Sequence, residues 1–545
     1  MGVTTQTDIK ELSDSGVASP ASAGLPKVWD AEDFFENVLL AYDHGEDDEL
    51  VADEALARSI IPAGTGAHRD FSYIAPEIPR FLNDKCVGCM MCVTECPDTA
   101  ILAKVVETPL LDEKLHEVDG QTDVEYLRQQ FATTNKFAKV PEKKGATPGQ
   151  FGIFVDPTKC KGCAECVEAC SDLGYDALEM VEKEDDTVPV YQNGMDFMRW
   201  LPPTPTEYIS DKVAVDMMLA EESLSPFVGG AGSCAGCGEV TVLRMWLAAM
   251  GYKYGSERLG IVAATGCNTV YGSTYPYNPY TVPWTNSLFE NAPADAIGIR
   301  MRWDQLGWED KQLWAIGGDG AMNDIGFQSL SRMMASGLNI KVLILDTQVY
   351  SNTGGQSSTA TFQAQETKMS QHGRVVPGKQ ELRKEIGRIC MMHPNTFVTQ
   401  VSAAIPNHFY KAILDAASFD GPAIVNAYTT CQPEHGVGDE AARRQAKHAV
   451  ESRAFPVFVY DPRKGETLKR RLNLQGNPGQ KDDWYTVRKT GEVVDFVSFA
   501  RTEGRFAKHF DKEGSPSETL LAAQADRLAN WHLLQEMAGV RVDPE

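Results

Sequence analysis

The distribution of cysteine constrains this chain more than any other feature. Twelve of its thirteen cysteines fall into three groups of four, and only Cys390 is left over. Two of the groups are compact runs, and the third is scattered along the chain. The first run is Cys86, Cys89, Cys92 and Cys96; the second is Cys160, Cys163, Cys166 and Cys170; the third group is Cys234, Cys237, Cys267 and Cys431.

Each run has the spacing C-x2-C-x2-C-x3-C, which bacterial ferredoxins use to hold [4Fe–4S] clusters. Zinc sites usually show two separated C-x2-C pairs instead, and a cytoplasmic chain has no need of disulfides. In two-cluster ferredoxins the fourth cysteine of each run serves the other cluster. The resemblance to these ferredoxins therefore gives Cys170 to the first cluster and Cys96 to the second. The second run departs from the pattern in one respect, because Ser171 stands where proline is usual.

Length and charge exclude several classes of protein. With 545 residues the chain is expected to form two or three domains. Its formal charge of −25 argues against nucleic-acid binding, which needs a basic surface. No stretch of about 18 apolar residues is present, so no transmembrane helix is expected. Residues 1–23 lack an apolar signal core, and we expect a solvated tail in a cytoplasmic protein.

The same negative charge bears on electron carriers, since ferredoxins are usually acidic themselves. Docking such a carrier would need a local basic patch. The segment between the two cysteine runs offers one candidate, formed by Lys136, Lys139, Lys143 and Lys144. The alternative is that these lysines belong to a solvated basic loop.

The order of patterns along the chain predicts four parts: a tail and linker (1–75), a two-cluster ferredoxin domain of α+β type (76–200) with an insertion at about 104–150, a cofactor-binding α/β domain (201–440), and a C-terminal extension that packs on it (441–545). Residues 29–57 are expected to be helical, as are residues 517–537. Apolar strands are predicted at Leu259–Ala264, Leu313–Ile316, Ile340–Leu345 and Ala423–Tyr428. Such strands, alternating with helical periodicity, indicate a parallel sheet covered on both faces.

A second signal lies at the ends of these strands. Gly318-Asp319-Gly320 follows one strand, and Asp346-Thr347 follows the next, with Asp319 placed 28 positions before Thr347. Thiamine-diphosphate enzymes hold Mg²⁺ with a glycine-flanked aspartate and a second polar ligand at about this separation. Mg²⁺ prefers octahedral oxygen ligands that it shares with phosphates, and a helix N-terminus favours the diphosphate. Most such enzymes have asparagine at the second position, where this chain has threonine.

At this point the chain closely resembles the pyruvate:ferredoxin oxidoreductase family, in which threonine occupies that position. The resemblance extends from about Pro62 to the C-terminus and corresponds to the ferredoxin domain followed by the thiamine-binding domain of the long single-chain members. The segments that carry it are 233–239 (SCAGCGE), 264–267 (ATGC), 284–290 (WTNSLFE), 318–320 (GDG), 346–358 (DTQVYSNTGGQSS), 427–431 (AYTTC) and 460–463 (YDPR).

The resemblance implies a role for each candidate residue. Asp319, the Thr347 side chain and the Val349 carbonyl would ligate Mg²⁺. The third cysteine group would hold a cluster beside the thiamine diphosphate. Asn352 would lie near the substrate or the reactive ring, and Glu239 would touch the cofactor; both are the candidate catalytic residues. The expected cofactor-binding set is completed by Gly318, Gly320, Thr353 and Cys267.

The resemblance also implies an activity. The chain would be the catalytic and electron-transfer subunit of a 2-oxoacid:ferredoxin oxidoreductase of the pyruvate synthase type, working through a thiamine-bound enamine and radical and three [4Fe–4S] clusters. Pyruvate, coenzyme A and oxidised ferredoxin or flavodoxin would give acetyl-CoA, CO2 and the reduced carrier, reversibly. The alternatives are the same chemistry on 2-oxoglutarate or another 2-oxoacid, and an electron-transfer subunit without thiamine catalysis.

Thiamine sites form between two domains, and no second thiamine-type domain is recognised in the sequence. A partner subunit that carries the pyrimidine-binding and coenzyme A-binding domains is therefore expected, in a hetero-oligomer built on a dimer. Outside this scheme, Cys390 is interpreted as a buried apolar thiol. His435 could tune a cluster, but a structural role is the simpler interpretation.

Overall fold

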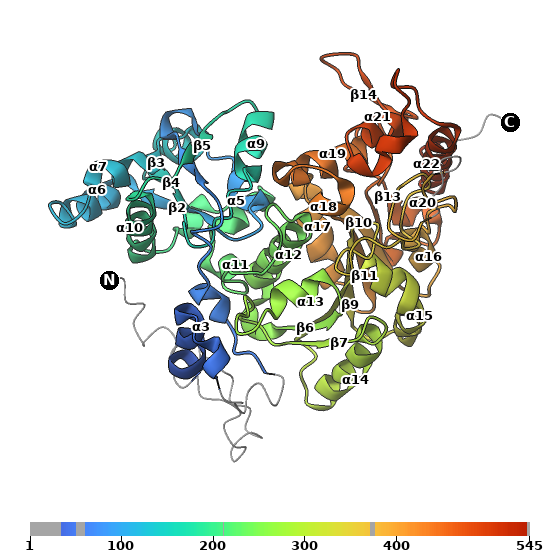
Figure 1. The fold of residues 1–545 in the computed structure, drawn as a ribbon, viewed down its shortest axis with the longest axis horizontal. Helices are drawn as coiled ribbons and strands as arrows, with labels where there is room; N and C mark the ends of the chain where they lie inside the picture. Colours follow the sequence, from blue (N-terminus) through green and yellow to red (C-terminus); the bar gives the residue numbers. More distant parts are fainter. Residues whose placement is uncertain (1–33, 51–59, 211, 371–376, 542–545) are drawn as a thin grey trace.

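The structure, a computed structural model, describes residues 34–50, 60–210, 212–370 and 377–541. Its main element is an eight-stranded sheet in the order β13-β12-β10-β11-β9-β8-β6-β7. The cysteine-rich region lies beside this sheet, as the blue-to-cyan elements of Figure 1 show. The α/β fold class predicted from the sequence is confirmed.

Six strands of the large sheet run parallel, from β10 at one side to β7 at the other edge. The remaining two, β12 and β13, extend it antiparallel beyond β10. The strands are β6 (Leu259–Ala264), β7 (Trp284–Ser287), β8 (Gln312–Gly318), β9 (Lys341–Asp346), β10 (Phe397–Ser402), β11 (Ala423–Tyr428), β12 (Phe458–Tyr460) and β13 (Leu472–Asn473). All four predicted strands are confirmed, and the central strands are buried along their length because helices cover both faces.

Two sets of helices cover the sheet. On one face lie α12 (Gly238–Tyr254) and α17 (Pro406–Ala417), whose apolar side chains share a core with the sheet. On the other face lie α14 (Ala292–Gln305), α15 (Phe327–Ser336), α16 (Ile386–Met391) and α22 (Glu518–Met537). Gly337 ends α15 in the left-handed conformation with φ 72°, as the Ser336-Gly337 pair predicts.

The cysteine-rich region is built from short elements. The strands β1 (Glu77–Phe81) and β5 (Leu178–Glu182) pair antiparallel and bracket both cysteine runs. Each run leads into a short helix, α5 (Met91–Glu95) or α9 (Glu165–Asp172), and these two helices pack together.

The insertion between the runs is folded rather than an irregular polar stretch. Its strands β2 (Ile101–Glu107), β4 (Gly149–Val155) and β3 (Phe131–Ala132) form an antiparallel sheet. The helices α6 (Thr108–Glu117), α7 (Val124–Gln129) and α10 (Thr187–Trp200) pack on that sheet around a separate apolar core. The turn after β3 contains η6 (Asn135–Lys139) and α8 (Val140–Lys143).

The remaining elements lie at the two ends of the described chain. Near the N-terminus, η2 (Phe35–Leu39), α3 (Leu40–His44) and η3 (Asp47–Glu49) confirm part of the helix expected at 29–57; residues 29–33 and 51–57 lie outside the described residues, as does the expected tail. The C-terminal part contains α18 (Gln432–His435), α19 (Ala442–Glu451), α20 (Leu468–Arg471), β14 (Tyr485–Thr486), β15 (Val493–Val494), α21 (Phe496–Arg501), η13 (Gly504–His509) and α22. Ser517 caps α22, so the predicted terminal helix is confirmed. Among the described helices, none is long and apolar enough to cross a membrane.

Candidate functional site

The first group of four thiols combines residues from both runs. Cys86, Cys89 and Cys92 of the first run line one small cavity together with Cys170 of the second. Burial raises the pKa of Cys92 well above its usual range, and the charges of the other three thiols raise it further. The structure therefore brings Cys170 to the first run, where the ferredoxin pattern predicts it; its role as a ligand remains a prediction.

The second group shows the reciprocal exchange. Cys160, Cys163 and Cys166 lie within electrostatic reach of Cys96 from the first run. Burial raises the pKa of Cys160 to about 12, with Cys96 as a further cause. Thiols that are so difficult to ionise in an apolar setting are suited to a bound cation, which stabilises the thiolate form.

The two cysteine loops share one backbone conformation, which explains how the repeated spacing folds. Gly88 and Met90 in the first loop have φ of 73° and 69°, and Gly162 and Ala164 in the second have φ of 68° and 63°. In the first loop, Cys86 Sγ accepts a hydrogen bond from the Gly88 amide at 3.4 Å. Left-handed residues at matching positions turn each loop tightly, so that successive cysteines face inward.

The third group is assembled from the ends of separate strands and helices. Cys237 caps α12, Cys267 begins α13 (Cys267–Gly272), and Cys431 lies between β11 and α18. Burial raises the pKa of Cys267, as do the charges of Glu239 and of the other three cysteines of the group, including the exposed Cys234. Four thiols separated widely in sequence are therefore neighbours at one edge of the sheet.

The predicted magnesium ligands meet at the same edge. Thr347 Oγ1 lies 3.2 Å from Asp319 Oδ1 and 3.0 Å from the Val349 carbonyl oxygen. Adjacent ligands of an octahedral ion at about 2.1 Å are about 3.0 Å apart. The two distances from the Thr347 hydroxyl are therefore close to the spacing that Mg²⁺ requires. Asp319 is fully buried, and burial together with the nearby Asp346 charge raises the pKa of its carboxyl. A cation bound there would stabilise the ionised carboxylate.

Three buried polar side chains, Glu239, Asn268 and Tyr271, lie close in sequence or in space to the third cysteine group. Glu239 is 4% exposed, and burial raises the pKa of its carboxyl to about 8. Its carboxyl group forms a hydrogen bond with the Cys267 thiol. Both side-chain amide atoms of Asn268 and the Tyr271 hydroxyl are buried without a hydrogen-bond partner. Because buried polar groups are rarely left unpaired, these atoms fit a polar cofactor placed beside them.

The structure gives less support to the other predicted cofactor-binding residues. Gly320 is needed sterically, because an added Cβ would lie 2.3 Å from the Tyr350 ring; Gly318 has no such close neighbour. Asn352 and Thr353 are exposed on the turn that follows Val349. Thr353 Oγ1 forms hydrogen bonds only within that turn, to the Tyr350 carbonyl and to Gln356. The structure therefore does not bring these two side chains into the buried oxygen site.

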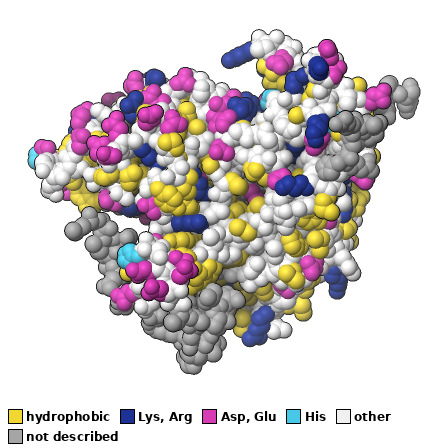
Figure 2. All heavy atoms as spheres, viewed as in Figure 1, with side chains coloured by type: hydrophobic (Ala, Val, Ile, Leu, Met, Phe, Trp, Pro, Cys, Tyr) yellow, Lys and Arg dark blue, Asp and Glu magenta, His cyan; other side chains and the backbone are white. Residues whose placement is uncertain are grey.

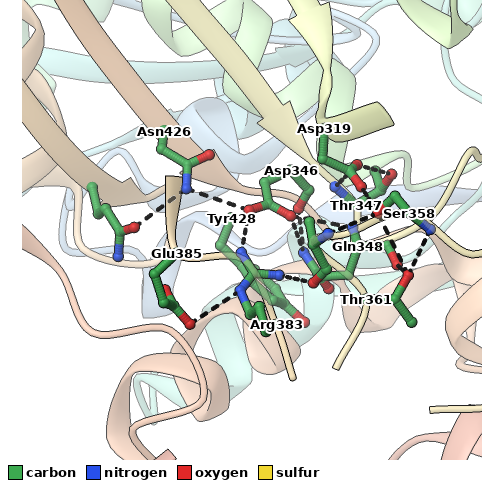
Figure 3. Close-up of polar contacts among 12 residues, drawn as sticks. Asp319, Asp346, Thr347, Gln348, Ser358, Thr361, Arg383, Glu385, Asn426 and Tyr428 are labelled. Atoms are coloured by element: carbon green, nitrogen blue, oxygen red, sulfur yellow. Dashed lines mark hydrogen bonds and ion pairs between the residues drawn. The ribbon is translucent and has the colours of Figure 1, made fainter. Parts of the chain in front are cut away.

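A buried hydrogen-bond network beneath the oxygen site was not foreseen from the sequence (Figure 3). Arg383 pairs with Asp346, and Arg505 donates to Gln348 Oε1 at 3.0 Å and pairs with Glu503 at 2.6 Å. The imidazole of His435, also fully buried, contacts the Thr347 carbonyl at 2.9 Å, which supports the structural interpretation of this residue. The network holds Gln348, whose φ of 59° is unfavourable for a non-glycine residue.

Nothing local in the sequence marks these supporting residues, because their partners are far away along the chain. Arg505 and Gln348 are 157 positions apart. Within the described residues, no three His, Cys, Asp or Glu side chains lie closely enough together to hold a single metal ion. The four thiols of a [4Fe–4S] cluster bind separate iron atoms and need not be so close. The oxygen site contains only one residue of those types, since its other donors are a hydroxyl and a backbone carbonyl.

Comparisons with known proteins bear on both regions. Residues 264–427 match the family model described as thiamine pyrophosphate enzyme, C-terminal TPP binding domain, and residues 79–102 match the 4Fe-4S binding domain. The chain is 28% identical over 597 residues to a probable pyruvate-flavodoxin oxidoreductase of Escherichia coli (strain K12), covering 96% of this chain and 46% of that protein. It is also 28% identical over 591 residues to the pyruvate:ferredoxin oxidoreductase of Moorella thermoacetica, covering 94% of this chain and 46% of that protein.

The chain thus spans about half the length of the curated relatives it matches. Among solved structures, the 2-oxoglutarate:ferredoxin oxidoreductase from Magnetococcus marinus is 22% identical with a TM-score of 0.31, and the match covers 37% of this chain and 64% of that one. This overlap is too small to carry an argument.

Proposed function

Because the chain belongs to the pyruvate:ferredoxin oxidoreductase family, we propose that it is the catalytic and electron-transfer subunit of a 2-oxoacid:ferredoxin oxidoreductase. Its reaction converts pyruvate, coenzyme A and an oxidised carrier into acetyl-CoA, CO2 and the reduced carrier, in either direction. The observation that carries this proposal is the preformed oxygen site beside four converging thiols.

Three residues of the chain hold the magnesium ion of the cofactor: Asp319 through its carboxylate, Thr347 through its hydroxyl and Val349 through its carbonyl. Thiamine diphosphate bound there supplies the electron sink for decarboxylation of a 2-oxoacid. Ser358 Oγ donates to Asp319 Oδ2 and keeps the Oδ1 atom turned toward Thr347. The Thr347 hydroxyl is therefore already in its ligand position before the metal binds.

Glu239 occupies the space between the cofactor and the third cysteine group. Burial raises the pKa of its carboxyl group, and the Asp319 charge raises that pKa further. A carboxyl group that is neutral near pH 7 can donate a hydrogen bond to the cofactor, as Asn268 and Tyr271 can from the neighbouring helix α13. These three side chains orient the bound cofactor and exclude water from its cluster-facing side.

The three cysteine groups hold three [4Fe–4S] clusters in a chain that leads outward. The second group lies next to the third, since Lys161 Nζ donates to the Ser233 carbonyl at 3.0 Å, one residue before Cys234. The first group shares helices α5 and α9 with the second through the exchange of Cys96 and Cys170. Electrons therefore have a sequence of sites from the oxygen edge to the surface.

A partner subunit completes the active site. Exposed apolar side chains flank the oxygen site, with Val270 46%, Leu288 60% and Ile325 50% exposed. Beside them is a groove of about 760 Å³, and the buried Asn323 that lines it has both amide atoms unpartnered. A wide groove beside exposed apolar side chains is suited to a covering domain. We assign this face to a pyrimidine-binding domain on a second chain.

The test is an anaerobic assay of the tagged chain isolated with its native partner. The complex is expected to reduce methyl viologen in the presence of both pyruvate and coenzyme A, and the chain alone is expected to be inactive. Full turnover by the chain alone would refute the partner. Faster turnover with 2-oxoglutarate than with pyruvate would change the substrate, and absence of thiamine from the complex would favour a subunit that only transfers electrons.

A further inference from the structure

We propose that the turn of η6 and α8, together with the first cysteine loop, is the surface on which an acidic one-electron carrier protein docks. This docking surface consists of Lys85, Val87, Lys139, Lys143, Lys144 and Tyr175. The proposal rests on the proposed function, because it locates the point at which electrons leave the chain.

Two exposed apolar side chains separate the first cysteine group from solvent. Val87, between Cys86 and Gly88, is 39% exposed, and Tyr175 is 37% exposed. Both residues also line the cavity that the four thiols share. A carrier that packs on Val87 and Tyr175 is therefore separated from the cluster by a single layer of side chains.

The lysine-bearing turn packs directly on this loop and is not a free solvated loop. A Cβ added to Gly88 would lie 2.9 Å from the Phe137 ring of η6. Phe137 is 1% exposed and stacks on Phe151 of β4 with ring centroids 5.2 Å apart. The Thr134 hydroxyl caps the turn by accepting from the Phe137 amide. The insertion thus fixes its lysines in place beside the cluster loop.

The charge of this surface differs from that of the molecule. Lys136 is not available for docking, because its ammonium group pairs with the buried Asp216. The other three lysines of the turn are exposed, as is Lys85. Within residues 83–88, 139–145 and 174–177, the exposed carboxylates are Asp84, Glu142 and Asp176, so four lysines and three carboxylates leave one net positive charge. The chain as a whole carries −25, and its acidic side chains gather mainly at the left of the face in Figure 2.

An apolar centre with a basic rim fits a small acidic carrier. Interfaces of this kind bury a few apolar contacts at the centre and use charges at the rim to speed and orient the encounter. An acidic carrier is repelled by most of this chain, so a basic island next to the outermost thiols would steer it to the one useful position.

The experiment uses the iron-loaded chain reduced with dithionite, so that no thiamine turnover is needed and failure of the proposed function would not disturb it. Stopped-flow mixing with an oxidised acidic flavodoxin measures the second-order rate of electron transfer. The variant Lys139→Glu/Lys143→Glu/Lys144→Glu is expected to slow this rate at least about tenfold at about 0.1 M salt. Reduction of methyl viologen, a small dye, should not slow.

A matched control makes the same change of charge elsewhere. Lys481, Lys489 and Lys512 are exposed in the C-terminal part, where β14 lies at the opposite side of Figure 1 from β3. The control variant Lys481→Glu/Lys489→Glu/Lys512→Glu is expected to change the rate less than about twofold, because surface charges are screened beyond about 10 Å at 0.1 M salt. A reciprocal variant, Glu142→Lys, is expected to accelerate transfer.

The proposal is overturned if the triple variant of the turn transfers electrons to flavodoxin as fast as the wild type, or if it slows no more than the control. It is also overturned if the variant instead loses association with a second copy or with the partner subunit, as measured by sedimentation, because the lysines would then belong to an assembly interface. Equal iron content in all variants shows that the first cluster is intact.

Discussion

The thiol groups and the oxygen site prepare for their cofactors in different ways. The thiols of the first group surround a cavity with apolar lining, and burial raises the pKa of Cys86 to about 12. Backbone amides donate to two of these thiols, from Gly88 to Cys86 and from Ala177 to Cys170, and the group otherwise relies on short loops and the short helices α5 and α9. The Asp319 site is held by side-chain hydrogen bonds from Thr347 and Ser358, and by a buried network below.

The difference teaches that the two cofactors contribute differently to folding. A cluster supplies the bonds that tie the cysteine loops together, so its binding energy is part of the folding energy of that region. The magnesium site is anchored on a large parallel sheet whose core does not include the metal. We therefore expect loss of iron to unfold one region, and loss of magnesium to leave the fold intact.

The largest effect is expected on removal of iron. Stripping the clusters with a chelator and an oxidant should lower the hydrogen-exchange protection of β1, β5, α5 and α9 by on the order of 100-fold or more. Protection of β8, β9 and β11 should remain. If hydrogen-exchange protection fell equally in the cysteine-rich region and in the large sheet, the proposed difference in their dependence on cofactors would be wrong.

The next effect is expected for Arg505→Met. This change leaves the buried Glu503 carboxylate without its partner, and breaking such a pair costs about 3–5 kcal/mol of unfolding free energy. Denaturant unfolding of the iron-loaded chain measures it. The double variant Glu503→Gln/Arg505→Met should recover much of the loss, because no unpaired charge remains; a double variant as unstable as the single one would contradict this account.

A smaller effect on stability, but a specific one on binding, is expected for Asp319→Asn. Binding of Mg²⁺–thiamine diphosphate should weaken on the order of 100-fold or more by calorimetry. Without metal, the raised pKa of Asp319 means that the folded state binds a proton more readily than the unfolded state. The stability of the metal-free wild type should therefore fall as pH rises from about 4 toward 8, and the variant should lack this component of the fall.

The smallest effect is expected for Cys390→Ala. Cys390 is fully buried in the core of the large sheet, away from the three thiol groups. Loss of one buried sulfur should cost about 1 kcal/mol and leave the iron content unchanged. Iron loss in this variant would show that Cys390 belongs to one of the cluster-binding groups.

Local patterns were sufficient to predict the parallel strands and the two compact cysteine runs, whereas the exchange of Cys96 and Cys170 and the third cysteine group were predicted from the family resemblance. The β-strand run at Leu259–Ala264 and the spacing of Cys86 to Cys96 are each contained in a few residues. The fold of the insertion was not predicted, because β2 and β4 pair Ile101 with Val155 across the whole excursion. The ion pair of Lys136 with the buried Asp216 joins residues 80 positions apart, which no local pattern shows.

Metal analysis of the anaerobically purified chain tests the central claim most directly. Three groups of four cysteines predict about twelve iron atoms and as much acid-labile sulfide per chain, with paramagnetic signals on reduction. Zinc in place of iron, or about eight irons with the third group empty, would contradict the arrangement of a cluster beside the magnesium site.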